Sequence, residues 1–248
     1  MRARQQNLIE RVYYPESDGK PMGETDRHRQ LMFDLIESLK NYFADDASVY
    51  VSGNLLLYYV EGDPSKSVAP DVFVVRGVAK HERRIYKLWE EEQPPTVVIE
   101  VSSRKTRNED LKWKKQLYAW FGVKEYFIFD PEYKLRPPLR AYRLIGNQLI
   151  EEPVIGNRVM SNELGLELVD DGKTLRLFNP RMGQFLLTPA EEAAARRVEA
   201  QARQQAENRA DSEAERAKRE AERAEREAER AERLAAKLRE LGIDPDKL

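Results

Sequence analysis

The composition of the chain changes abruptly at Pro189. From residue 190 to the C-terminus most residues are Ala, Glu, Arg, Lys or Gln. Alanines recur there at alternating spacings of four and three residues, the heptad pattern of a coiled-coil seam: Ala210, Ala214, Ala217, Ala221, Ala224, Ala228, Ala231 and Ala235. Three glutamates precede an arginine by four residues, the favourable order for helical ion pairs: Glu215–Arg219, Glu222–Arg226 and Glu229–Arg233. The pattern predicts one long helix over about 190–241.

The break divides the chain into a predicted globular domain, residues 1–189, and a helical tail, residues 190–248. The tail holds 16 acidic and 14 basic residues and the domain 28 of each, so the tail carries the whole net charge of −2. An alanine seam buries little apolar area, which makes a weak zipper. Two interpretations stay open: a solvated helix or loose coiled coil, and a rod that mediates dimerisation or docks a coiled-coil partner.

Residue counts exclude several classes of protein. The chain has no cysteine, which excludes disulfides, thiolate zinc sites and a cysteine nucleophile. Its two histidines, His28 and His81, are too few for a multi-histidine metal site. No apolar run has the length of a signal peptide core or a membrane span, so we expect a soluble cytoplasmic protein with no membrane partner. The isoelectric point of about 6.0 gives no global signal for nucleic acid.

Hydrophobic periodicity in the first 189 residues predicts an α/β fold. Leucines at i, i+4 spacing predict an amphipathic helix over Glu24–Phe43, and a second helix is expected over about Asn108–Phe121, closed by Gly122. Predicted strands are Val49–Val60, with Gly53-Asn54 as a hairpin turn or bulge within it, Val72–Arg76, Thr96–Ser102, Glu125–Asp130, Ala141–Ile145 and Leu149–Val154. The second helix lies between two strands, so a βαβ crossover and a parallel pair are expected at the centre of a mixed sheet.

Two acidic residues interrupt apolar strands. Asp71 opens the run PDVFVV, and Glu100 lies inside VVIEVSS. A carboxylate in such a position is costly to bury without a partner charge or a metal. Either acid alone could pair with a nearby arginine. Both together, on neighbouring strands, suit a hard cation with oxygen ligands, namely Mg²⁺ or Mn²⁺.

A lysine of the second helix accompanies these acids. Asp110, Lys114 and Tyr118 share one helix face, and apolar residues flank Lys114, so it is expected to point partly inward. Lys112 is expected to point to solvent, and Lys115 is intermediate. An inward lysine could orient a nucleophilic water or stabilise an oxyanion, and a surface lysine with a buried stem is the alternative.

Two further observations concern charge near these residues. Glu24 begins the first helix, where it could be a third acid of the site or could simply complement the helix dipole. The segment from Ser102 to Lys115 is locally basic, and basic segments beside carboxylates are what a metal-dependent phosphodiesterase needs. The candidate phosphate-binding residues are Arg104, Lys105, Arg107 and Lys115.

The stretches VAPDVFVV and VVIEVSSRKTRNEDLKWKKQLYAWFGVKEYFIFDPE resemble the Uma-type family of restriction endonucleases, within the PD-(D/E)XK nuclease superfamily. The resemblance covers most of residues 10–189. It rests on PD, E-V-S-S, the T-x-x-x-D-x-x-x-K-x-x-x-Y-x-x-x-G-V-x-E-Y pattern and DP arriving in that order. It implies a restriction endonuclease-like mixed sheet flanked by helices.

The resemblance also implies roles for residues. Asp71 and Glu100 would be catalytic and bind Mg²⁺ or Mn²⁺, with the main-chain carbonyl of Val101 as a further ligand. Glu24 matches the first-helix glutamate of the family. Serine stands at position 102 where the superfamily often has lysine, so the catalytic lysine would be Lys114, with Lys115 as the alternative.

The predicted function is a metal-dependent endonuclease that hydrolyses DNA. Homodimerisation stays open. A non-catalytic nuclease-like scaffold that binds DNA or protein, and uses the tail for assembly, is the alternative.

Overall fold

The computed structural model describes residues 12–17, 19 and 25–240. Contacts divide the chain into two compact units, residues 1–189 and 190–248, which are described separately. In the described part of the chain, no helix has both the length and the apolar character that crossing a membrane requires.

A six-stranded sheet forms the centre of the first unit. Its strand order is β1 (Val49–Ser52), β4 (Val72–Arg76), β6 (Val97–Val101), β7 (Glu125–Phe129), β8 (Leu139–Ile145) and β9 (Gln148–Glu152). Strands β6 and β7 are parallel, and the other neighbours pair antiparallel. The α/β class, the mixed sheet and the central parallel pair predicted from the sequence are confirmed.

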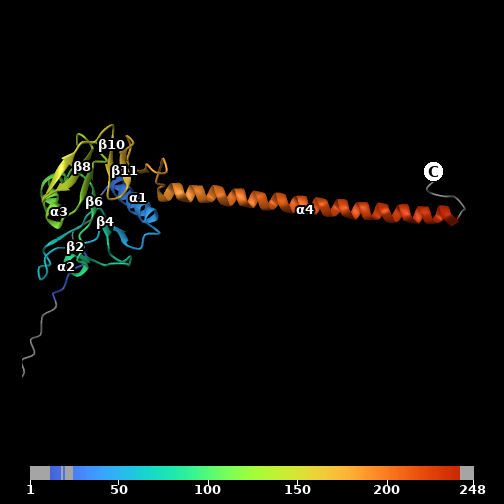
Figure 1. Ribbon diagram of the computed structural model, residues 1–248, viewed down its shortest axis with the longest axis horizontal. Helices are drawn as coiled ribbons and strands as arrows, with labels where there is room; N and C mark the ends of the chain where they lie inside the picture. The colour runs from blue at the N-terminus through green and yellow to red at the C-terminus, as the bar shows by residue number, and fades with distance from the viewer. Residues whose placement is uncertain (1–11, 18, 20–24, 241–248) are drawn as a thin grey trace, which may run out of the picture. The chain divides into compact units, whose positions relative to one another are not determined.

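Two helical segments cover opposite faces of this sheet (Figure 1). Helix α1 (Asp26–Tyr42) packs its leucines against Val97, Ile99 and Val101. The β6–β7 crossover contains a π-helical segment, η1 (Glu109–Lys114), followed by α3 (Lys115–Phe121). These cover the face that carries Val98. Because successive strand residues face opposite sides, Glu100 points to the η1–α3 side, and so do Val98 and Ile128.

The predicted strand Val49–Val60 divides at Gly53-Asn54. Strand β1 ends at Ser52, and β2 (Leu57–Tyr58) belongs to a separate sheet with β3 (Ser67–Val68) and β5 (Tyr86–Lys87). Asn54 adopts a φ of 50°, and its N–H donates to the Pro70 carbonyl at 2.8 Å. The interruption is confirmed, but it is a change of sheet rather than a hairpin turn or a bulge.

A second antiparallel sheet and a short helix were not predicted. The sheet contains β10 (Arg158–Ser161), β11 (Leu166–Asp170), β12 (Leu175–Asn179) and β13 (Gln184–Phe185). Its inward residues, Leu166, Leu168 and Leu177 among them, join the core formed by α1 and the central sheet. The short helix is α2 (Leu88–Glu91). Helix α1 therefore packs its leucine face against both sheets, while its outer face, with Phe33, is exposed.

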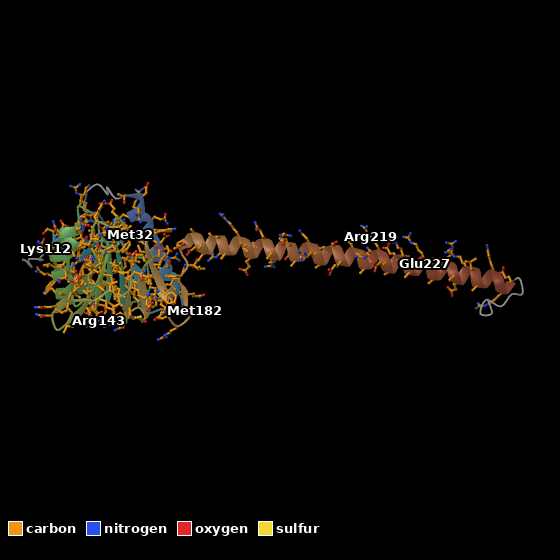
Figure 2. All side chains as sticks on the ribbon, turned by 90° about the horizontal axis from the view of Figure 1, so that it is seen from above. Met32, Lys112, Arg143, Met182, Arg219 and Glu227 are labelled. Carbon is orange, nitrogen blue, oxygen red and sulfur yellow. The ribbon has the colours of Figure 1, made fainter. Side chains whose placement is uncertain are left out.

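In the second unit the structure describes helix α4 (Pro189–Glu240), which is 52 residues long and is drawn without a break in Figure 1. The three predicted ion pairs are present, at 3.2, 3.8 and 3.1 Å for Glu215–Arg219, Glu222–Arg226 and Glu229–Arg233. Nearly all described side chains of α4 are exposed, and Figure 2 shows them projecting along its length, Arg219 and Glu227 included. The predicted long helix is confirmed, and its use in dimerisation or partner binding stays a prediction.

Gly53 leads to a test of this fold. A Cβ at Gly53 would lie 2.0 Å from the Asp71 carbonyl oxygen and 2.6 Å from Ile36 Cδ1. We expect Gly53→Ala to lower the free energy of unfolding by about 2–4 kcal/mol, because backbone cannot yield as a flexible side chain does. Gly62→Ala, at a φ of +83° with open space around it, should cost only about 1 kcal/mol. Urea denaturation followed by circular dichroism measures both, and equal losses would contradict the packing argument.

Candidate active site

Acidic and basic side chains from four segments meet where the start of strand β4 lies beside the end of strand β6. Asp71 immediately precedes β4, Glu100 lies in β6, Lys114 ends η1, and His28 comes from α1. Glu100 is fully buried, and the side chain of Asp71 is 15% exposed. Strand pairing brings the two acids together, because Val72 lies opposite Ile99 in the β4–β6 register. The site therefore rests on the sheet itself.

Both carboxylate oxygens of Glu100 make polar contacts. Lys114 Nζ lies 3.0 Å from Glu100 Oε2, and the Tyr118 hydroxyl donates to Glu100 Oε1 at 2.6 Å. Lys114 Nζ also lies 3.0 Å from Oδ1 of Asp110, which is buried. One lysine thus bridges two buried carboxylates, which satisfies the requirement that a buried charge be paired.

Asp71 is held by backbone and by a histidine. The Val101 N–H donates to Asp71 Oδ2 at 2.8 Å, and His28 Nε2 lies 3.4 Å from Asp71 Oδ1. The Asp71 N–H points at Glu100 Oε2, at 3.4 Å. These contacts fix the Asp71 carboxylate beside Glu100 and Val101.

The two acids have opposite pKa shifts. Burial alone would raise the pKa of Asp71, but the hydrogen bond from His28 and the charge of Lys114 outweigh it, so this pKa lies below 3.8. Burial raises the pKa of Glu100 well above its usual value. Lys114 opposes that rise, whereas Asp71 and Asp110 add to it. Burial would lower the pKa of Lys114, but attraction to Glu100, Asp110 and Asp71 raises it above its usual value. The lysine is therefore charged at neutral pH.

The charge balance of this cluster suits an additional cation. Two carboxylates, of Glu100 and Asp110, contact the single ammonium group of Lys114, and the Asp71 carboxylate is near enough to add to the attraction on it. Within residues 12–17, 19 and 25–240, no three or more acidic or histidine side chains form a metal-binding group. Mg²⁺ commonly takes only one or two carboxylates and keeps water or substrate oxygens as its other ligands. The Asp71–Glu100 pair, with the main chain of Val101 beside it, matches that ligand chemistry.

The three lysines of the β6–β7 crossover have the exposures that the sequence predicts. Lys114 is buried, Lys115 is partly buried, and Lys112, which Figure 2 labels, is exposed. Lys115 Nζ lies 5.0 Å from the centre of the Tyr142 ring rather than beside the acids. Of the two candidate catalytic lysines, only Lys114 contacts the acidic cluster. Glu24 lies outside the described residues.

The candidate phosphate-binding residues are placed differently from one another. Arg104 and Lys105 are exposed and line a cavity of about 160 Å³ together with His28 and Ser102. Arg107 is instead paired with buried Asp130 at 2.8 Å. The structure thus brings two of the four candidates, Arg104 and Lys105, to the cavity beside the acidic cluster.

Sequence reasoning did not assign His28 or Asp110 to this site. His28 lies in no recognisable motif, and the packing of α1 on β4 brings it to Asp71. Asp110 was noted for sharing a helix face with Lys114, and the structure buries both residues. Tyr126, in β7, donates to the Asp110 carbonyl at 3.0 Å and anchors η1.

Loss of the Lys114 charge should destabilise the fold in a pH-dependent way. We expect Lys114→Met to cost about 3–5 kcal/mol of unfolding free energy at pH 8, because it leaves buried carboxylates unpaired. The loss should shrink toward pH 5, since protonation of Glu100, whose pKa is already raised, removes one unpaired charge.

Urea denaturation at both pH values measures this loss. Lys124→Met is the matched control: Lys124 is exposed and precedes β7 at the end that pairs with Val97, away from Glu100. A Lys114→Met loss that is the same at both pH values would contradict the charge-pairing account.

Comparison with known proteins agrees with the sequence resemblance. A family model described as "Uma2: Putative restriction endonuclease" matches residues 5–171. The chain is also similar to a solved structure described as a "putative nuclease belonging to DUF820 from Anabaena variabilis", with 16% sequence identity, a TM-score of 0.43, and coverage of 62% of this chain and 86% of that chain. A search of curated proteins finds no match. Because the family match spans more than half of the sequence, the chain belongs to the Uma2 family of restriction endonuclease-like proteins.

Proposed function

We propose that the protein is a metal-dependent endonuclease that hydrolyses DNA phosphodiester bonds. The observation that carries the proposal is the contact of buried Glu100 with both Lys114 and the Asp71 backbone. An acid pair next to a charged lysine is the set of groups that such hydrolysis uses. Membership of a family described as restriction endonucleases supports the same reaction class.

In this proposal Asp71 and Glu100 hold Mg²⁺ or Mn²⁺, with the carbonyl of Val101 as a further ligand. A divalent ion bound there supplies polarisation of the scissile phosphate and a lower pKa for the attacking water. The charge balance of the cluster supports this assignment, since Glu100 and Asp110 both contact the one lysine and Asp71 lies beside Glu100. His28 acts through Asp71, whose Oδ1 it faces at 3.4 Å, and so orients that carboxylate.

The remaining groups bind substrate and offset charge. The Lys114 ammonium, 3.0 Å from Glu100 Oε2, is placed to orient water or to stabilise negative charge on the phosphate. Arg104 and Lys105, exposed beside His28, bind the phosphate backbone of DNA. Lys115 and Arg107 contact Tyr142 and Asp130, so they contribute less to DNA binding.

A non-catalytic scaffold is the second candidate. It is favoured by the serine at position 102 and by the contacts that already engage both oxygens of Glu100. The 52-residue helix α4 would then mediate assembly, as a homodimer or with another coiled-coil partner.

Plasmid cleavage tests the nuclease. Supercoiled DNA should be nicked in Mg²⁺ or Mn²⁺ and left intact in EDTA. Asp71→Asn and Glu100→Gln should each lower the rate about 100-fold or more, since each removes a charge from the proposed metal site. Glu61→Gln, a charge-matched change at an exposed residue, should leave the rate unchanged. Equal nicking by the wild type and an Asp71→Asn/Glu100→Gln double variant would overturn the proposal.

Metal binding separates the two candidates without measuring activity. Calorimetric titration with Mn²⁺ should show saturable binding to the wild type and to Glu61→Gln, and none to Asp71→Asn or Glu100→Gln, because each loses an anionic ligand. If the wild type binds no Mn²⁺, the scaffold is the better account.

A further inference from the structure

A cleft of about 750 Å³ opens beside the acidic cluster and shares Lys114 with it. Its walls come from the β2–β3 region, the N-terminal segment and η1, which contribute Ser65, Ser17 and Trp113 respectively. Ala69, two residues before Asp71, is also in its wall. The cleft thus adjoins the proposed active site, and its volume suits a nucleoside-sized group.

The residues that line this cleft carry too little positive charge to bind a phosphate backbone. Of its described lining residues, Lys114 is the only cation, and Glu109 adds a negative charge. A carboxylate repels phosphate but accepts hydrogen bonds from the amino groups of nucleobases. The hydroxyls of Ser17, Ser65 and Ser67 can donate to or accept from base edges. The chemistry of the lining therefore fits a base better than a phosphate.

An exposed aromatic row extends from the same cleft. Trp113 is 45% exposed, and Trp120 is 67% exposed seven residues later. With Gln116 they form the solvent-facing row of η1 and α3, opposite the buried Asp110, Lys114 and Tyr118. The ring of Trp120 lies 6.1 Å from that of Tyr59. Exposure of an apolar indole ring to water is unfavourable, and in nucleic-acid-binding proteins such rings commonly stack on unpaired bases.

We propose that this cleft and aromatic row bind unpaired bases of the substrate strand, with Trp113 stacking on the base next to the scissile phosphate. The inference rests on the proposed nuclease function and names its substrate class: DNA with single-stranded nucleotides at the cleavage site, such as a single strand or a forked junction. In an uninterrupted duplex every base is stacked and paired, so a base could enter the cleft only after the cost of unstacking and unpairing it had been met.

Binding without metal tests the inference apart from cleavage. Fluorescence anisotropy in EDTA measures the full-length protein on a labelled single strand, on the matching blunt duplex and on the same strand carrying abasic sites. We expect the wild type to bind the single strand more tightly than the duplex. Trp113→Ala should weaken single-strand binding about tenfold or more and change duplex binding less than twofold.

Two comparisons control for indirect effects. Trp89→Ala removes an indole that packs on Tyr14 at 5.2 Å, outside the cleft lining, and should leave single-strand binding unchanged. On the abasic strand, wild type and Trp113→Ala should bind alike, because no base remains to stack.

The inference is overturned if Trp113→Ala binds the intact single strand as the wild type does, or weakens single-strand and duplex binding equally. Either result would leave the aromatic row as a surface for a partner protein. Failure of the nuclease proposal is distinguishable, because it appears as Asp71→Asn and wild type cutting alike in Mg²⁺ whatever the binding result.

Discussion

The burial of the Glu100 carboxylate within the central sheet is the constraint on which the site depends. A strand residue with no water around it must find its partners in neighbouring elements, and Glu100 finds Tyr118 in α3, Lys114 in η1 and the backbone of Asp71 before β4. Each partner is thereby fixed to the sheet. The contacts that compensate for burial of the Glu100 carboxylate also bring the candidate catalytic groups together. One set of interactions therefore serves both the stability of the fold and the proposed chemistry.

The β6–β7 crossover approaches the site through a π-helical segment. In η1 both Asp110 and Lys114, four residues apart, are buried, while Trp113 stays exposed. π-Helical turns add a residue to the helix and are common at functional sites. The Tyr126 hydroxyl bonds the Asp110 carbonyl from the sheet, and its ring packs against Tyr118 at 5.1 Å. The face of the sheet toward α3 is thus rich in tyrosines, whose rings fill the core and whose hydroxyls hold polar groups.

Local patterns were sufficient for the central sheet, the crossover helix and the inward lysine. Each depends on residues close in sequence: apolar runs for the strands, the helix-ending Gly122 for the crossover, and apolar neighbours around Lys114. Prediction failed where contacts join distant segments. The pairing of Arg107 with Asp130 and the approach of His28 to Asp71 have no local signature. The second sheet was missed although Leu166–Asp170 alternates apolar and polar residues, the ordinary signal of a half-buried strand, and its leucines join the core that α1 and the central sheet form.

The two sides of the acid pair differ in chemistry, and this difference gives the proposed substrate an orientation. On the side of His28, the exposed cations Arg104 and Lys105 line one cavity. On the side of Lys114, hydroxyls, Glu109 and Trp113 line the other. Phosphates are attracted to the first and repelled from much of the second, whereas bases gain stacking only in the second. A strand crossing Asp71 and Glu100 would therefore keep its backbone over the basic side and turn a base toward Trp113. That path favours a backbone free of its complementary strand, since a paired base would first have to be unstacked and unpaired to reach the cleft.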